Sequence, residues 1–197
     1  MKIKTLVLGP MDNAVYIVEK NGSAILIDPS WDMAEVENNL SGLKLEALFF
    51  THGHFDHMTD VEPFLRAHKI KAFIEEGDVK MSKLPSDVLA PFQGSQNMKL
   101  GPFDIEIIHT PGHSAGSVCI KIGNDLFTGD TLFPGACGRV DLPGANPRQM
   151  RESLYKLSLL PPETKVYAGH GDEASTIGRE RECNHYMQSS VRDMGKK

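Results

Sequence analysis

A chain of 197 residues with 40% apolar and 24% charged residues has the composition of a soluble globular protein. That composition excludes a disordered or fibrous protein. The 26 acidic residues outnumber the 21 basic ones, giving a net charge of -5, and no basic stripe is visible. We therefore expect no nucleic-acid partner. Since no run of 18 apolar residues occurs, we also expect no membrane span.

The N-terminus and the cysteines both indicate a cytoplasmic protein. The first apolar stretch, Leu6-Val7-Leu8, is short and is interrupted by Gly9-Pro10, which argues against a secretory signal. The three cysteines lack CxxC spacing, so a disulfide framework is not expected and a reducing compartment is favoured.

Apolar runs separated by turn residues predict a strand-rich chain with helices interleaved. Asn21-Gly22 between two apolar runs is typical of a type I′ hairpin. The predicted strands are residues 3–8, 14–18, 24–27, 45–50, 71–74, 103–109, 117–122, 126–128 and 165–168. The predicted helices are 61–68, with Asp60 as N-cap, 148–160 and 177–191, with a broken helix between 75 and 101. This pattern predicts sheets covered by helices, an α/β or α+β fold.

One segment gathers an unusual number of metal-binding residue types. The sequence Thr51 to His57, THGHFDH, follows the buried strand predicted at 45–50. His52 and His54 are two residues apart, so in an extended segment they point to the same side. Asp56 and His57 lie beyond, where the chain turns toward the next helix. Imidazole and carboxylate together suit zinc, iron or manganese rather than calcium or magnesium.

Three more candidates follow the ends of other predicted strands. His113, Asp130 and His170 each come directly after a glycine, which lets the backbone pass close to a site. A layered sheet fold builds its sites at the carboxyl ends of strands, so we expect these residues to meet the histidine segment there.

This ordered set of residues resembles the metallo-β-lactamase fold superfamily over nearly the whole chain. The resemblance implies one domain, residues 1–197, folded as a four-layer αββα sandwich with two divalent metal ions, zinc first, with iron or manganese as alternatives. It implies that His52, His54 and His113 hold one ion and that Asp56, His57 and His170 hold the second. Asp130 would bridge the two ions. Asp28 would support these ligands without touching a metal, and Asp56 would act with a metal-bridging hydroxide in catalysis.

Within the superfamily, the stretch 138–144, GRVDLPG, resembles the glyoxalase II group. That resemblance implies hydrolysis of a small-molecule thiolester similar to S-lactoylglutathione. Only 27 residues follow His170, so the glutathione site of the longer enzymes does not carry over. Arg139 either contacts an anionic substrate or forms a structural ion pair with Asp141.

Three alternatives stay open at this point. A mono-iron persulfide dioxygenase of the same fold would use His52, His113 and Asp130. The others are a hydrolase of another ester or lactone, and a non-catalytic metal-binding protein. The sequence leaves the oligomeric state open.

Overall fold

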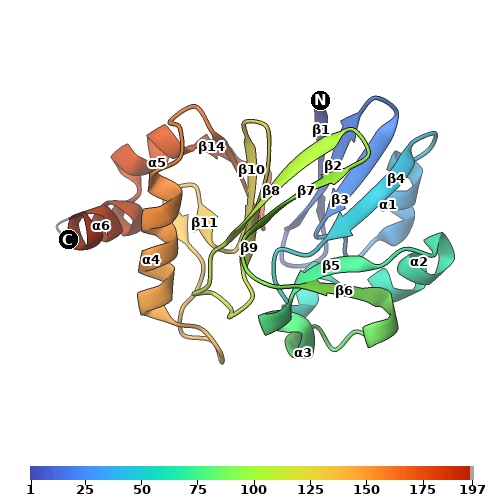
Figure 1. Ribbon diagram of the computed structural model, residues 1–197, viewed down its shortest axis with the longest axis horizontal. Coiled ribbons are helices and arrows are strands. Elements are labelled where there is room, and N and C mark those ends of the chain that lie inside the picture. The colour runs from blue at the N-terminus through green and yellow to red at the C-terminus, as the bar shows by residue number, and fades with distance from the viewer. Residues whose placement is uncertain (196–197) are drawn as a thin grey trace.

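The computed structural model describes residues 1–195, which form two six-stranded sheets packed face to face with helices outside both (Figure 1). The order of layers is helix, sheet, sheet, helix, and the predicted αββα sandwich is confirmed. None of the helices in this described part of the chain is both long enough and apolar enough to cross a membrane.

The first sheet has its strands in the order of the sequence. The first three strands pair antiparallel, and the third to the sixth strands pair parallel. Helices α1 (Met33–Asn39) and α2 (Val61–His68) lie on the outer face of this sheet. Asn21 and Gly22 both have positive φ, 52° and 78°, which confirms the predicted hairpin. The strands are β1 (Lys2–Leu8), β2 (Asn13–Lys20), β3 (Ser23–Ile27), β4 (Lys44–Phe49), β5 (Ala72–Glu75) and β6 (Leu89–Phe92).

The second sheet has the order β14-β13-β10-β9-β8-β7, in which only the β10–β13 pair is parallel. Its outer face is covered by α4 (Pro147–Ser158), α5 (Ile177–Cys183) and α6 (His185–Met194), on the left in Figure 1. The strands are β7 (Gln96–Leu100), β8 (Phe103–His109), β9 (Val118–Ile122), β10 (Asp125–Gly129), β13 (Lys165–Ala168) and β14 (Ala174–Thr176). A small hairpin, β11 (Leu132–Phe133) and β12 (Ala136–Cys137), lies between β10 and α4 along the chain.

Three apolar cores hold the four layers together, because the central strands are buried on both faces. Phe49 and Phe103 meet between the two sheets, Leu65 packs from α2 onto the first sheet, and Leu157 packs from α4 onto the second. The strand ends that carry the candidate site residues are therefore fixed from both sides.

Two local predictions were wrong, and a third, Asp60 as the N-cap of α2, holds for the position but not for the hydrogen bond. The segment 75–101 contains β6, β7 and short helical turns, among them α3 (Val79–Ser82), instead of a broken helix. Both strands are sheet edges, where Pro91 is tolerated and the apolar pattern is weak. The last helix is two helices, because the side chain of Asn184 accepts from the backbone N–H groups of Tyr186 and Met187 and starts α6. Asp60 precedes α2 but makes no capping hydrogen bond.

The sequence analysis also left several short elements unassigned. These are α1, the β11–β12 hairpin and β14, which span seven residues or fewer each.

Candidate metal centre

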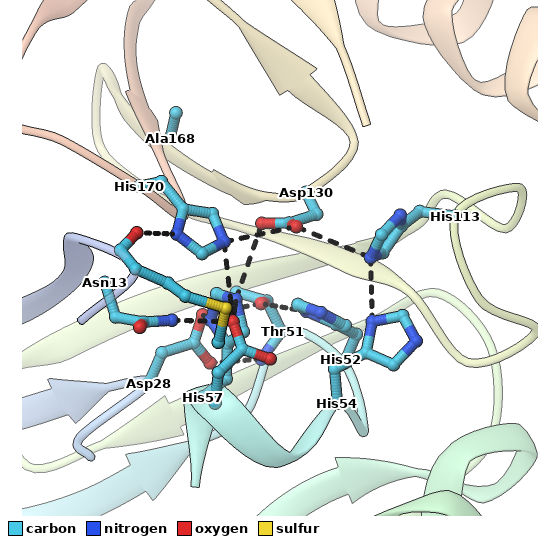
Figure 2. A network of polar contacts seen from close by, with 12 residues as sticks. Asn13, Asp28, Thr51, His52, His54, His57, His113, Asp130, Ala168 and His170 are labelled. Atoms are coloured by element: carbon cyan, nitrogen blue, oxygen red, sulfur yellow. Dashed lines mark hydrogen bonds and ion pairs between the residues drawn. The ribbon is translucent and has the colours of Figure 1, made fainter. Parts of the chain in front are cut away.

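The candidate residues converge at one edge of the two sheets, because each follows a strand that ends there. His52 follows β4, His113 follows β8, Asp130 follows β10 and His170 follows β13 (Figure 2). His54, Asp56 and His57 come from the turn after His52, in which residues 55–57 form a short 3₁₀ turn. The structure thus brings together all seven of the predicted ligands.

The first group of donors consists of His52, His54 and His113, whose ligand atoms all lie within 4.8 Å of one another. His113 Nδ1 donates to the carbonyl oxygen of Arg139 at 2.9 Å, which leaves Nε2 as its free donor atom. That Nε2 lies 2.8 Å from His54 Nδ1. His52 is buried, and its Nε2 has no hydrogen-bond partner.

The second group consists of Asp56, His57 and His170. His170 Nδ1 donates to the carbonyl oxygen of Met11 at 2.8 Å, and His57 Nδ1 lies 3.2 Å from Asp28 Oδ2. Both imidazoles therefore present Nε2, at 3.6 and 3.4 Å respectively from Asp56 Oδ2.

Asp130 lies between the two groups. Its Oδ1 is 3.5 Å from His57 Nε2, and its Oδ2 is 3.4 Å from the Nε2 atoms of both His113 and His170. Oδ1 is buried and has no hydrogen-bond partner. The carboxylate of Asp130 thus lies between the two donor groups, where a ligand that bridges two metal ions would lie.

The pKa values of the histidines in the cluster shift in two opposite directions. Burial lowers the pKa of His52 well below its usual value, and neighbouring His57 adds to the effect. Burial and His113 likewise lower the pKa of His54. Burial also opposes protonation of His57, but the carboxylates of Asp130, Asp28 and Asp56 outweigh it and raise its pKa to about 9.

Asp130 is held as a carboxylate. Burial alone would raise its pKa, but a hydrogen bond from His170 and the nearby imidazoles of His57 and His52 lower it far below the usual range. The same contact with Asp130 overcomes burial at His170 and raises the pKa of that histidine. Asp130 therefore places a buried negative charge between the two donor groups.

The residues fit a divalent metal. Within residues 1–195, His52 Nε2, His57 Nε2 and Asp130 Oδ1 are buried polar atoms without hydrogen-bond partners, and burying such atoms is costly unless something binds them. All three atoms face the centre of the cluster, and the donors are imidazole nitrogens and carboxylate oxygens. This set suits zinc, iron or manganese.

Asp28 has the supporting contacts expected of a residue outside the donor set. Its Oδ1 accepts from the backbone N–H of Thr51 at 2.7 Å, and its Oδ2 accepts from Thr51 Oγ1 at 2.6 Å. Oδ2 also faces His57 Nδ1. Because both oxygens are already engaged, Asp28 orients His57 and the start of the histidine segment.

Asn13 is a supporting residue that the sequence analysis missed. Its Nδ2 donates to Asp56 Oδ2 at 2.8 Å, and its Oδ1 accepts from Trp31 Nε1 at 2.9 Å. The contact crosses 43 residues of sequence, so no local spacing could have indicated it. It fixes Asp56 Oδ2, the oxygen that also lies near the Nε2 atoms of His57 and His170.

Asp78 is a second missed residue, and it joins two of the loops that carry donors. It is fully buried after β5, and its Oδ2 accepts from the backbone N–H of Gly53 at 2.8 Å and from Ser114 Oγ at 2.5 Å. Its Oδ1 accepts from the N–H of Gly116 at 2.8 Å. A Cβ on Gly53 would lie 2.7 Å from the Asp78 carbonyl oxygen, so the packing is close. The strand-end rule that found the donors would also have pointed to Asp78.

The glycines before the candidate donors do let the backbone pass close to the site. A Cβ on Gly129 would collide with Thr51, and its φ is 48°. A Cβ on Gly169 would collide with the carboxylate of Asp130. At these two positions a side chain would displace the centre itself.

The centre opens into a cleft of about 560 Å³. One wall is apolar, and the Arg139 guanidinium lies at the rim, where it makes two 3.0 Å hydrogen bonds to the carboxylate of Asp141. The ion pair that the sequence suggested for Arg139 is therefore present. The lining residues are Met11, His54, Phe55, Asp56, His113, Asp130, Phe133, Cys137, Gly138, Arg139, Leu142, Pro143 and His170.

A four-layer αββα sandwich with a histidine and aspartate centre at one edge defines a class of metallo-hydrolases. Residues 8–170 match the Metallo-beta-lactamase superfamily, and the chain belongs to that superfamily.

Two relatives and one solved structure show how far the likeness extends. The probable polyketide biosynthesis zinc-dependent hydrolase PksB of Bacillus subtilis (strain 168) is 31% identical over 163 residues, covering 80% of this chain and 72% of the relative. The hydroxyacylglutathione hydrolase of Alkalilimnicola ehrlichii is 35% identical over 170 residues, covering 81% of this chain and 61% of the relative. The crystal structure of TTHA1623 in a di-iron-bound form has 33% identity and a TM-score of 0.82, covering 93% of this chain and 99% of that one.

Proposed function

We propose that this chain is a binuclear metal-dependent hydrolase of thiolesters, of the glyoxalase II type. The observation that carries the proposal is the pair of donor groups sharing Asp130 at the base of the cleft. One group is His52, His54 and His113; the other is Asp56, His57 and His170. The hydroxyacylglutathione hydrolase relative and the di-iron-bound neighbour support this proposal.

Two divalent ions held by these side chains would lower the pKa of a water molecule and polarise the carbonyl of the substrate. Zinc is the first choice, with iron or manganese as alternatives. The protein's part is to hold the donors rigidly. The Nδ1 atoms of His57, His113 and His170 are tied to Asp28, Arg139 and Met11, so each ring presents Nε2. Asn13 fixes Asp56, which we place beside the attacking water.

The residues that line the cleft favour a substrate whose leaving group needs no proton from a general acid. Apart from the proposed metal donors, the titratable side chains that line it in residues 1–195 are Cys137 and Arg139. The Arg139 guanidinium is paired with Asp141, and burial raises the pKa of Cys137 to about 11, so neither is a good proton donor. A thiolate leaves without protonation, whereas the amine of an amide needs a proton. We therefore favour a thiolester over an amide.

The test combines metal analysis with two assays on the purified protein. We expect two metal ions per chain and release of thiol from a thiolester such as S-lactoylglutathione. One iron per chain with oxygen uptake on glutathione persulfide, and without thiol release, would instead support the persulfide dioxygenase.

His54→Ala separates the same two functions. His54 belongs to the proposed binuclear donor set but is not one of the dioxygenase's three, His52, His113 and Asp130. We expect the variant to lose most of the metal bound by the first group and most of the hydrolysis. Full turnover by His54→Ala would refute the hydrolase assignment.

We further propose a cytoplasmic location, because Cys119, Cys137 and Cys183 are all free. We propose a small-molecule substrate and no nucleic-acid partner, because the net charge is -5. Fractionation of cells that express the chain at its native level would test this location.

A further inference from the structure

Five apolar side chains line the cleft together with the candidate metal donors, and we call these five side chains the apolar wall. Phe55 is 65% exposed and Met11 is 40% exposed, and both line the cleft together with Phe133, Leu142 and Pro143. Phe55 directly follows His54, which lines the same cleft. Exposed aromatic and aliphatic side chains that gather at a cleft are typical of a binding surface.

The charges around this wall do not suit an anionic ligand. Arg139 is the one lysine or arginine that lines the cleft in residues 1–195, and its Nε and Nη2 both donate to Asp141. Glutathione carries two carboxylates and one ammonium group, so its arm would meet apolar side chains and a single arginine that already shares its charge with Asp141. A carboxylate placed against the apolar side chains would lose water without gaining a partner.

We propose that the apolar wall binds the thiol portion of the substrate, and that this thiol portion is uncharged next to the metal centre. The inference rests on the proposed thiolester hydrolysis and deepens it. In that reaction the oxygen of water bonds to the acyl carbon, the carbon–sulfur bond breaks, and a proton of water ends on the released thiol. The acyl group faces the metal donors, and the thiol arm runs along Phe55, Met11 and Leu142.

The first experiment compares two thiolesters with the same acyl group on the metal-loaded protein. S-lactoyl-N-acetylcysteamine has an uncharged thiol, and S-lactoylglutathione has a charged one. We expect kcat/KM for the uncharged thiolester to be at least about tenfold higher, because one unpaired carboxylate in an apolar contact costs at least that factor. Equal values, or a preference for glutathione, would overturn the inference while leaving thiolester hydrolysis intact.

A binding measurement tests the preference for an uncharged thiol arm without requiring hydrolysis. Calorimetry on the metal-free protein compares S-hexyl-N-acetylcysteamine with S-hexylglutathione, two thioethers that cannot be hydrolysed. Tighter binding of the uncharged thioether supports the inference, and equal or weaker binding overturns it. If neither thiolester releases thiol, the proposed function fails, but this comparison still decides which arm the cleft accepts.

Two substitutions assign the selectivity to named residues. Phe55→Ala should raise KM for S-lactoyl-N-acetylcysteamine about fivefold to tenfold by removing apolar contact. Leu159→Ala is the matched control, because Leu159 is 68% exposed and is not among the residues that line the cleft. Equal effects of the two substitutions would contradict a role for the wall.

Asp141→Asn tests the charge argument in the opposite direction. The substitution frees Arg139 and removes one negative charge from the rim. We expect the ratio of KM for S-lactoylglutathione to KM for S-lactoyl-N-acetylcysteamine to fall about fivefold, the size of an exposed ion-pair interaction. An unchanged ratio would show that the Arg139–Asp141 pair does not influence which thiol arm is accepted.

Discussion

Replacing Asp78 by asparagine should weaken both the fold and the first group of metal donors. The carboxylate accepts three hydrogen bonds, from the N–H groups of Gly53 and Gly116 and from Ser114 Oγ, and it is fully buried. An asparagine side chain keeps one acceptor oxygen and turns an N–H toward the other donor. At least one buried backbone N–H then loses its partner.

The magnitude follows from these contacts. A hydrogen bond to a charged group contributes about 1.5 to 3 kcal/mol, and an unsatisfied buried donor costs about 1 to 3 kcal/mol. Because removing a buried charge offsets part of this cost, we expect Asp78→Asn to lower the free energy of unfolding by about 2 to 4 kcal/mol. The matched control is Asp104→Asn, since Asp104 is 76% exposed and its one ion pair in the described part of the chain is with Lys99. That control should change the free energy by less than about 0.5 kcal/mol.

The metal affinity of Asp78→Asn shows whether Asp78 positions the metal donors or only stabilises the fold. Gly53 lies between His52 and His54, and Ser114 follows His113, so Asp78 holds both segments of the first donor group. We expect Asp78→Asn to weaken metal binding by this group about 10-fold to 100-fold, the usual effect of losing a supporting contact. Binding by Asp56, His57 and His170 should stay the same.

The assays are urea denaturation of metal-free protein and competitive metal titration against a chelating dye. Normal unfolding together with two unchanged metal affinities would refute the reasoning altogether. A stability loss with unchanged metal affinities would leave Asp78 a structural residue only.

Three further results are expected. Asn184→Ala should lower the free energy of unfolding by about 2 to 3 kcal/mol in urea denaturation, because its buried amide caps α6 and bonds the β11–β12 hairpin. Iodoacetamide at pH 8, followed by mass spectrometry, should label exposed Cys183 before Cys137. Burial raises the pKa of Cys137 to about 11. The labelling rate of Cys137 should therefore rise about tenfold per pH unit until the pH reaches that pKa. Gly169→Ala should reduce bound metal severalfold, because its Cβ would collide with a carboxylate of the site, whereas Gly171→Ala has open space and should retain both ions despite about 1 kcal/mol of backbone strain.

Local patterns predicted sheets covered by helices and placed the candidate histidines and aspartates at strand ends, whereas the four-layer order and the roles of the donors came from the family resemblance. Apolar runs buried on both faces are easy to recognise, and strand ends in a layered fold meet at one edge. Histidine and aspartate at those ends therefore could be assigned to one site before any coordinates were known. The edge strands β6 and β7 could not be predicted in the same way, because one face is exposed and Pro91 interrupts the pattern.

The supporting contacts could not be read from sequence, because their partners are far apart along the chain. Asn13 reaches Asp56 across 43 residues, and Asp78 reaches Gly116 across 38. The place of Asp78 near a strand end makes it a candidate from the sequence, but the sequence does not show which loops it joins. Asn13 has no comparable signal, and the partners of both residues become visible only in the fold.

Contacts within the chain orient four of the imidazoles in the candidate centre. His113 and His170 each donate Nδ1–H to a backbone carbonyl, and His57 Nδ1 faces Asp28. His52 Nδ1 lies 3.1 Å from Thr51 Oγ1, which itself donates to Asp28. These four contacts point each Nε2 toward the other donors, and such supporting contacts fix the orientation and tautomer of a histidine that binds metal. For these four rings we therefore expect metal affinity to depend on the supporting residues as well as on the donors, which is why Asp28 and Thr51, whose side chains hold His57 and His52, deserve the same mutational scrutiny as the histidines.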